Sequence, residues 1–167
     1  NRFFLRRWLP WVDGVRIAED SAQFVERSIQ QYRRAQALNI GIWRHRQIIG
    51  VVSFHTFDWK TGSTSMGYWL AASQNGQGII SAASRSMIQL AFMYFKLETI
   101  SIRCATRNLK SRAVAEKIGC RFNGVTRKAE LLKTREKTEK VNKTGFFNFD
   151  GAKFTRPIAI GNLGYSI

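Results

Sequence analysis

The stretch Ser73-Gln74-Asn75-Gly76-Gln77-Gly78-Ile79-Ile80-Ser81 decides how the middle of this chain folds. It follows a strand-like run, Ser65-Met66-Gly67-Tyr68-Trp69-Leu70, and leads into a long segment with helical periodicity. A glycine-rich turn between a strand and a helix exposes backbone N–H groups that have no intrahelical partner, and the helix dipole adds positive potential there. Gly76 and Gly78 carry no Cβ, so the backbone can approach a ligand closely and adopt a positive φ. The turn is therefore a candidate site for a phosphate or diphosphate.

Two glycines alone do not separate this interpretation from a tight loop that ends in an ordinary helix. The turn lacks the Lys-Ser/Thr pair of a P-loop, and no third glycine completes a dinucleotide-binding fingerprint. The surrounding sequence must therefore decide between the two.

Segments of helix and strand periodicity lie on both sides of the turn. Asp20 or Ser21 can cap a first helix, whose apolar stripe consists of Phe24, Val25, Ile29 and Tyr32. Strands are expected at 38–43, 48–57, 64–70, 99–105 and 121–128, and further helices at 80–94 and 111–118, the last ended by Gly119. This order is helix, three-strand meander, helix, strand, helix, strand. It predicts a mixed α/β sheet with helices on its faces.

Length and charge limit the classes of protein and partner. With 167 residues, 44% of them hydrophobic, the chain can bury one core and is expected to form one main domain. It contains no apolar run long enough to cross a bilayer and begins with no signal-peptide pattern, so we expect no membrane association. Lys and Arg number 27 against 11 acidic residues, a formal charge of +16 that favours an anionic partner: an acidic protein, a nucleic acid or a phosphorylated cofactor. Because the basic residues are spread along the chain, a generally basic surface is preferred to a dedicated RNA groove.

The cysteines and histidines give no reason to expect a metal site. Cys104 lies in an apolar strand-like run and Cys120 follows Gly119, so both are interpreted as small core residues. His45 belongs to a polar turn, while His55 lies in a predicted strand and is more simply a structural histidine than a residue lining a cleft.

Several short motifs recur in a recognisable order. They are Trp8-Leu9-Pro10-Trp11-Val12-Asp13, Gly41-Ile42-Trp43, Gly67-Tyr68-Trp69-Leu70, the glycine turn, Ile102-Arg103-Cys104-Ala105-Thr106, Asn108-Leu109-Lys110-Ser111-Arg112-Ala113 and Ile118-Gly119-Cys120-Arg121-Phe122. Over roughly residues 1–132 the chain resembles the GNAT superfamily of N-acetyltransferases, most of all the Rim-type acetyltransferases of ribosomal-protein N-termini. The resemblance implies a GNAT-like, mainly antiparallel mixed sheet flanked by helices, acetyl-CoA as cosubstrate, and acetyl transfer to an amine.

The resemblance also implies where the cosubstrate binds. The diphosphate of acetyl-CoA would lie on the backbone amides of the turn, and backbone groups at a splayed strand would hold the pantetheine arm, with an asparagine beyond the next strand. The residues so implied are Asn75, Gly76, Gln77, Gly78, Ile79, Ile80 and Ser81 for the diphosphate, Trp69 and Leu70 for the arm, and Asn108. Ser73 and Gln77 replace polar or basic residues that are common in the family, which leaves a main-chain cradle.

Acetyl transfer needs a base for the amine proton, donors for the oxyanion and an acid for the leaving thiolate. The resemblance implies Ser111 as the acid and Glu130 as the base. For Ser111 the alternative is an N-cap of the helix that it opens, and both roles can coexist. For Glu130 the alternative is a surface partner of Lys128 or Lys133. The resemblance places Trp8, Trp11 and Asp13 on the acceptor side.

Two departures from the family pattern affect these expectations. The family's first strand and the start of its first helix have no counterpart before Asn1. From about residue 133 onward, a charged and Thr-rich stretch replaces the expected final strand pair, so 133–167 is predicted to be a divergent, poorly packed basic tail after a domain at 1–132.

The leading hypothesis is a cytoplasmic, acetyl-CoA-dependent N-acetyltransferase. Its acceptor would be a protein N-terminal α-amine, such as that of an acidic ribosomal protein, or a small amine, and the resemblance leaves room for a homodimer. The alternatives are an inactive remnant that still binds CoA or a partner, and a basic nucleic-acid-associated protein. We rank the last lowest because the aromatic residues fall in the acetyltransferase motifs.

Overall fold

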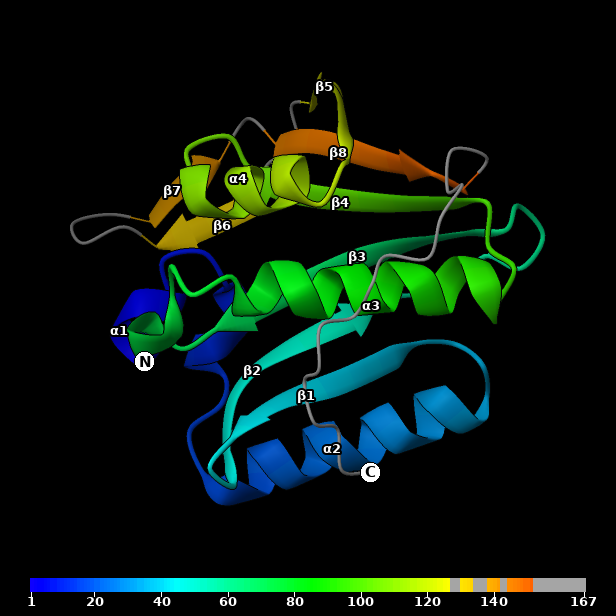
Figure 1. Cartoon of the computed structure of the whole chain (residues 1–167). Coiled ribbons are helices and arrows are strands. Elements are labelled where there is room, and N and C mark those ends of the chain that lie inside the picture. Colours follow the sequence, from blue (N-terminus) through cyan, green and yellow to red (C-terminus); the bar gives the residue numbers. More distant parts are fainter. Residues whose placement is uncertain (127–129, 134–137, 142–143, 152–167) are drawn as a thin grey trace.

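The chain folds around one mixed sheet, as the sequence predicts. The computed structural model describes residues 1–126, 130–133, 138–141 and 144–151. Its main sheet has six strands in the order β1-β2-β3-β4-β8-β5, as Figure 1 shows. The strands are β1 (Leu38–Arg44), β2 (Gln47–Phe54), β3 (Ser63–Leu70), β4 (Thr99–Ala105), β8 (Thr144–Asp150) and β5 (Arg121–Thr126). Within this sheet, the β3–β4 pair is parallel and the other pairs are antiparallel, so the predicted mainly antiparallel sheet is confirmed. A separate hairpin joins β6 (Glu130–Lys133) to β7 (Thr138–Val141).

Two helices cover one face of the main sheet. They are α3 (Ile79–Met93) and α4 (Leu109–Lys117), which contact each other and the strands behind them (Figure 1). The core between helices and sheet is formed by buried side chains of both layers, with Phe54, Ile88, Ile100 and Phe147 almost completely buried. Burial of side chains of this size is the main stabilising contribution to the fold.

The helix α2 (Ala18–Arg33) lies against the opposite face. Ser28 Oγ accepts a hydrogen bond from the Asn39 side chain at 3.1 Å, and Asn39 Oδ1 accepts one from Ser53 Oγ at 2.6 Å. Ser53 alternates along β2 with Val52 and Phe54, which face the core, so this polar chain and α2 lie on the other side of the sheet. The apolar stripe that predicted the helix is exposed, and α2 buries none of its residues. Periodicity therefore predicted the helix but not where its apolar side would lie.

The start of α2 corrects the predicted cap. The helix begins at Ala18, so Asp20 and Ser21 lie inside its first turn. Asp20 Oδ2 instead accepts the backbone N–H groups of Arg16 at 2.7 Å and Ile17 at 3.0 Å, just before the helix. These hydrogen bonds favour the ionised carboxylate and lower the pKa of Asp20.

The expectation of a poorly packed chain from residue 133 onward is wrong for β8. This strand lies between β4 and β5 and pairs with both, from Thr144 to Asp150 on the β4 side. Phe147 is 1% exposed and belongs to the core. Residues 152–167 of the predicted tail lie outside the described residues, and the domain boundary after 132 stays a prediction.

Short helical turns complete the described chain. They are α1 (Arg2–Leu5), η1 (Pro10–Asp13) and η2 (Ala72–Gln74), the first two at the N-terminal end and the third just after β3. None of the described helices is long and apolar enough to cross a bilayer.

Candidate functional site

The glycine turn adopts the open conformation that a backbone anion site requires. After η2, Gly76 has φ +81° and Gly78 has φ +76°, both in the left-handed region that favours glycine. A Cβ built on either residue meets nothing within 4 Å, so both glycines face open space. The helix α3 begins directly after Gly78, and its first N–H groups have no intrahelical partner by geometry. The turn therefore points unpaired donors and the positive end of a helix dipole into this space.

A cavity of about 500 Å³ opens at this turn. Its lining contains the residues that the sequence assigned to the cosubstrate, apart from Gln77, together with the predicted acid Ser111. They are Trp69, Leu70, Asn75, Gly76, Gly78, Ile79, Ile80, Ser81, Asn108 and Ser111. Segments around β3, the N-terminus of α3 and the N-terminus of α4 are thus brought to one hollow.

The strands β3 and β4 separate where they reach the cavity. Their parallel pairing runs from Ser63–Thr99 to Met66–Ile102 and then stops, although β3 continues to Leu70 and β4 to Ala105. On its other side Leu70 still pairs with Gly50 of β2. Backbone groups near Trp69 and Leu70 on the β4 side are therefore free of that ladder. An extended amide-containing chain could pair with them as a further strand does.

Asn108 and Ser111 lie together at the start of α4, and Asn108 is the residue that caps this helix. Asn108 is the N-cap, and its Oδ1 accepts the Ser111 backbone N–H at 3.2 Å. The alternative role of Ser111 as the helix cap is therefore wrong, because Ser111 is the third residue of the helix. The Ser111 hydroxyl remains available and points to another partner.

That partner is Tyr68, which the sequence did not single out as a functional residue. The Ser111 hydroxyl donates to Tyr68 Oη at 3.2 Å, and the Tyr68 hydroxyl donates to the Ser111 carbonyl at 2.9 Å. Burial raises the pKa of Tyr68 above its ordinary value, so the phenol stays protonated over the physiological range. Tyr68 belongs to the Gly67-Tyr68-Trp69-Leu70 motif, but 43 residues separate it from Ser111 and no local pattern connects the two.

Glu130 is the first residue of β6, and β6 contacts η1. The side chain of Glu130 lies outside the described part of the structure. Its predicted role as the base therefore stays a prediction.

The N-terminal segment forms another wall of the cavity. Phe4, Leu5, Trp8 and Leu9 line it, and the Asn1 side chain accepts the Ala72 N–H at 2.9 Å beside the glycine turn. Trp11, from η1, has its ring centroid 6.4 Å from that of Trp69 in a tilted arrangement. Of the residues predicted on the acceptor side, Trp8 thus lines the cavity itself, while Trp11 contacts a residue that lines it.

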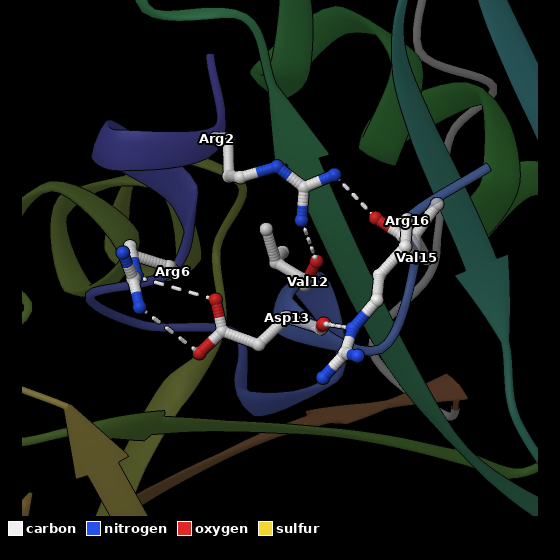
Figure 2. Close-up of polar contacts among 6 residues, drawn as sticks. All are labelled: Arg2, Arg6, Val12, Asp13, Val15 and Arg16. Atoms are coloured by element: carbon white, nitrogen blue, oxygen red, sulfur yellow. Dashed lines mark hydrogen bonds and ion pairs between the residues drawn. The ribbon is translucent and has the colours of Figure 1, made fainter.

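Arginines hold this segment in place (Figure 2). The Arg2 guanidinium donates to the carbonyls of Val12, at 2.6 Å, and Val15. Arg6 pairs with the Asp13 carboxylate at 3.2 Å, so Asp13 has a structural partner on the predicted acceptor side. These contacts, one ion pair and several arginine–carbonyl hydrogen bonds, hold residues 2–16 together as a loop.

Cys104, Cys120 and His55 do not line the cavity. Cys104 and Cys120 are buried free thiols of the core, and burial raises the pKa of both, that of Cys120 to about 12. His55 lies just after β2 with Nδ1 3.0 Å from Ser65 Oγ, and burial, with a contribution from Arg103, lowers its pKa. Among the described residues no group of three or more His, Cys, Asp or Glu side chains is placed to hold a metal ion.

Comparison with known proteins gives this geometry a family. The family model described as "Acetyltransferase (GNAT) domain" matches residues 2–121. The chain belongs to the GNAT acetyltransferase family. The predicted family and GNAT-like fold are confirmed, as is the predicted enzyme class, an acetyl-CoA-dependent acyltransferase.

Individual GNAT relatives resemble the chain over most of its length. The ribosomal-protein-serine acetyltransferase of Escherichia coli (strain K12) is 31% identical over 132 residues, which are 79% of this chain and 74% of that protein. The crystal structure of MccE, the microcin C7 self-immunity acetyltransferase, in complex with acetyl-CoA and AMP has a TM-score of 0.82 at 29% identity and covers 90% of this chain and 81% of its own. The coenzyme A complex of RimL, the ribosomal L7/L12 α-N-protein acetyltransferase, also has a TM-score of 0.82, at 24% identity, over 90% of this chain and 82% of its own, which shows the same fold.

The described residues fit the GNAT cosubstrate. The open positive-φ glycines, the free strand edge at Trp69 and Leu70, and the hydroxyl of Ser111 follow one another around a single cavity. This order suits a ligand with a diphosphate at one end, an amide-containing arm in the middle and a thioester at the other end.

Proposed function

We propose that this protein transfers the acetyl group of acetyl-CoA to the N-terminal α-amine of a protein, of the ribosomal-protein type. The observation that carries the proposal is the one cavity that joins the glycine turn, the free edge of β3 and the Ser111 hydroxyl. The similarity to a ribosomal-protein-serine acetyltransferase supports the acceptor class.

The proposed binding site divides the cosubstrate among three elements. Amides of the segment from Asn75 to Ser81 hold the diphosphate, apart from that of Asn75 itself, which donates to the Ala72 carbonyl at 3.3 Å, and the dipole of α3 adds to their positive potential. Backbone groups at Trp69 and Leu70 pair with the arm, and Asn108 contacts it while it also caps α4. Exposed anions bound by backbone N–H groups form charge-assisted hydrogen bonds, which are stronger than neutral ones.

In the proposed reaction the amine nitrogen forms a bond to the acetyl carbonyl carbon, and the carbon–sulfur bond breaks. Glu130 takes the proton that the amine loses, and Ser111 gives its hydroxyl proton to the departing thiolate. Tyr68 holds the Ser111 hydroxyl in place through the bond at 3.2 Å, and its raised pKa keeps its own proton on the phenol. Backbone N–H groups at the end of β3 meet the carbonyl oxygen as it gains negative charge.

The charge of the chain supports an acidic acceptor. At a formal charge of +16, the protein attracts an acidic polypeptide over distances comparable to a Debye length of about 8–10 Å. Turnover of an acidic peptide should therefore fall as salt is added. A rate that does not depend on salt would remove electrostatic attraction from the argument.

A small amine is the second candidate acceptor. It is favoured by the similarity to MccE, which is 29% identical and covers 90% of this chain, the same share as RimL. The MccE structure holds AMP as well as acetyl-CoA. A cationic amine would be repelled by this protein, so salt should raise its turnover or leave it unchanged.

The test compares acceptors at a fixed concentration of acetyl-CoA. An acidic peptide that begins with Ser, the same peptide with its N-terminus blocked, and an amine linked to a nucleotide are each incubated with the protein. Mass spectrometry should find one acetyl group on the free peptide alone. Acetylation of the nucleotide amine alone would favour the second candidate. Binding of CoA without turnover of any acceptor would favour an inactive remnant.

The proposal includes the cytoplasm as the place of action and a homodimer as the assembly. The apolar side chains of α2 that remain exposed offer a surface for self-association. Sedimentation velocity over a range of protein concentrations tests the dimer.

A further inference from the structure

The hairpin between β1 and β2 reaches the glycine turn. Arg44 ends β1 and pairs with Gln47 of β2, so His45 and Arg46 form a two-residue connection. Both have positive φ, +46° and +63°, the backbone that tight hairpin turns of this length require. This conformation fixes where the last residue of β1 directs its side chain.

Arg44 binds the glycine turn at two points. Its Nη1 donates to Gln74 Oε1 at 2.8 Å and to Gln77 Oε1 at 2.9 Å. These two glutamines lie on either side of Asn75 and Gly76, and Gln77 Nε2 also donates to the Ser73 carbonyl at 3.4 Å. One guanidinium thus bridges the two ends of the segment that carries Gly76, a glycine with positive φ.

The turn itself has no cationic residue. From Ser73 to Ser81 the sequence contains neither Lys nor Arg. Its glycines also have more conformational freedom than any other residue, so the turn loses much entropy when it becomes ordered around a ligand. The charged group that contacts the turn comes instead from a hairpin some thirty residues earlier, since Arg44 and Gln74 are 30 positions apart.

We propose that Arg44 is a positioning residue for acetyl-CoA, which acts through Gln74 and Gln77 to hold the turn in its binding conformation. This inference rests on the proposed cosubstrate site. A ligand binds a fractionally populated conformation with an affinity reduced by that fraction, so releasing the turn weakens binding of the diphosphate. The chemistry at the thioester, which would lie at the other end of the cavity near Ser111, is left unchanged.

The test uses two charge deletions in the same hairpin. Arg44→Ala removes the guanidinium that contacts Gln74 and Gln77, which we call the tether. Arg46→Ala removes an equal charge from the two-residue connection of the same β1–β2 hairpin. Isothermal titration should find acetyl-CoA binding about five- to tenfold weaker for Arg44→Ala, as expected for exposed charge-assisted bonds, and near the parent value for Arg46→Ala. In steady-state kinetics Arg44→Ala should raise the KM for acetyl-CoA by a similar factor and leave kcat near the parent value.

Two further measurements separate the tether from other roles. In a Gln74→Ala, Gln77→Ala background, adding Arg44→Ala should have no further effect, because its partners are already gone. With S-acetylpantetheine, which lacks the diphosphate, Arg44→Ala and the parent should have equal KM values. Arg44→Lys keeps the charge but loses the planar fork, and should give an intermediate KM for acetyl-CoA.

Each contrary result has a definite meaning. Equal affinities of Arg44→Ala and Arg46→Ala for acetyl-CoA would overturn the inference while leaving the proposed function intact. A full, additive loss in the double-glutamine background would overturn the tether, because Arg44 would then act without the glutamines. Absence of acetyl-CoA binding by the parent protein would overturn the proposed function, and this inference with it.

Discussion

Replacing Gly78 should separate the strain of the turn from its contact with the cosubstrate. Gly78 has φ +76°, and a Cβ built there meets nothing within 4 Å. A side chain at this position would therefore be destabilising because of the strained backbone conformation and not because of a steric clash. A non-glycine residue in this region costs about 1–2 kcal/mol. Gly78→Ala should therefore lower the free energy of unfolding by about that amount, and Gly78→Val by somewhat more because Val is β-branched.

The effect on binding should exceed this strain. A Cβ at Gly78 occupies the open space in which the diphosphate would meet the backbone, and each charge-assisted bond lost costs about 1.5–3 kcal/mol. Losing one such bond corresponds to an acetyl-CoA Kd that rises roughly 10- to 100-fold, since about 1.4 kcal/mol is a factor of ten. Isothermal titration measures this rise, and Gln77→Ala should change Kd far less than Gly78→Val because the proposed phosphate contacts are main-chain.

Gly124 provides a matched control for the strain. It has φ +127° in β5, and a Cβ built there also meets nothing within 4 Å, but it does not line the cavity. Gly124→Ala should lose stability in a thermal melt and bind acetyl-CoA like the parent. If Gly78→Val also bound acetyl-CoA like the parent, the reasoning that places the diphosphate on this turn would be refuted.

Three predictions concern the reacting end of the cavity. Asn108→Ala should lower the free energy of unfolding by about 1 kcal/mol, because Asn108 caps α4. Ser111→Ala should instead slow turnover with little change in the thermal melt. A loss of stability in Ser111→Ala but not in Asn108→Ala would contradict the assigned cap. Glu130→Gln should slow turnover by about 10²–10⁴-fold while the acetyl-CoA Kd stays near that of the parent, and an unchanged initial rate would remove Glu130 as the base. Because the pKa of Tyr68 is raised, the folded state holds the phenol proton more tightly than the unfolded chain does. The resulting contribution to the free energy of unfolding is complete below about pH 10 and is lost as the pH rises further. Tyr68→Phe should make the loss of stability at high pH smaller in urea unfolding, and a pH dependence identical to that of the parent would show that Tyr68 does not cause it.

The parts of the site that the sequence predicted are those fixed by local backbone chemistry. Gly76 and Gly78 could be identified because positive φ and a helix start are local requirements. The strand at 99–105 was predicted with its observed bounds because its β-branched residues alternate along a short run. Asn108 as the N-cap could also have been predicted, since asparagine is among the preferred capping residues, whereas the cap considered from the sequence was Ser111, as an alternative to its role as the acid.

The parts that the sequence did not predict depend on tertiary contacts. β8 joins the sheet between β4 and β5, although β6 and β7 lie between β5 and β8 in the sequence, and pairing between strands that are not consecutive leaves no local pattern. Its apolar alternation, Phe147 and Phe149, is short and follows a charged stretch. The stripe of α2 was visible in the sequence, yet only the fold shows that it stays exposed. The bond between Tyr68 and Ser111 likewise requires β3 and α4 to meet.

The fold offers a physical reason why the proposed phosphate-binding turn needs no charged residue of its own. Two helices begin at the same cavity, α3 at Ile79 and α4 at Leu109, and each directs the positive end of its dipole toward it. In the proposed reaction the cosubstrate is anionic at both of these places, permanently at the diphosphate and transiently at the thiolate. Backbone dipoles can stabilise both charges without moving during the reaction, because they are fixed by the fold. Side-chain charge is then needed mainly to hold the turn, which is the role that a single guanidinium at Arg44 can fill.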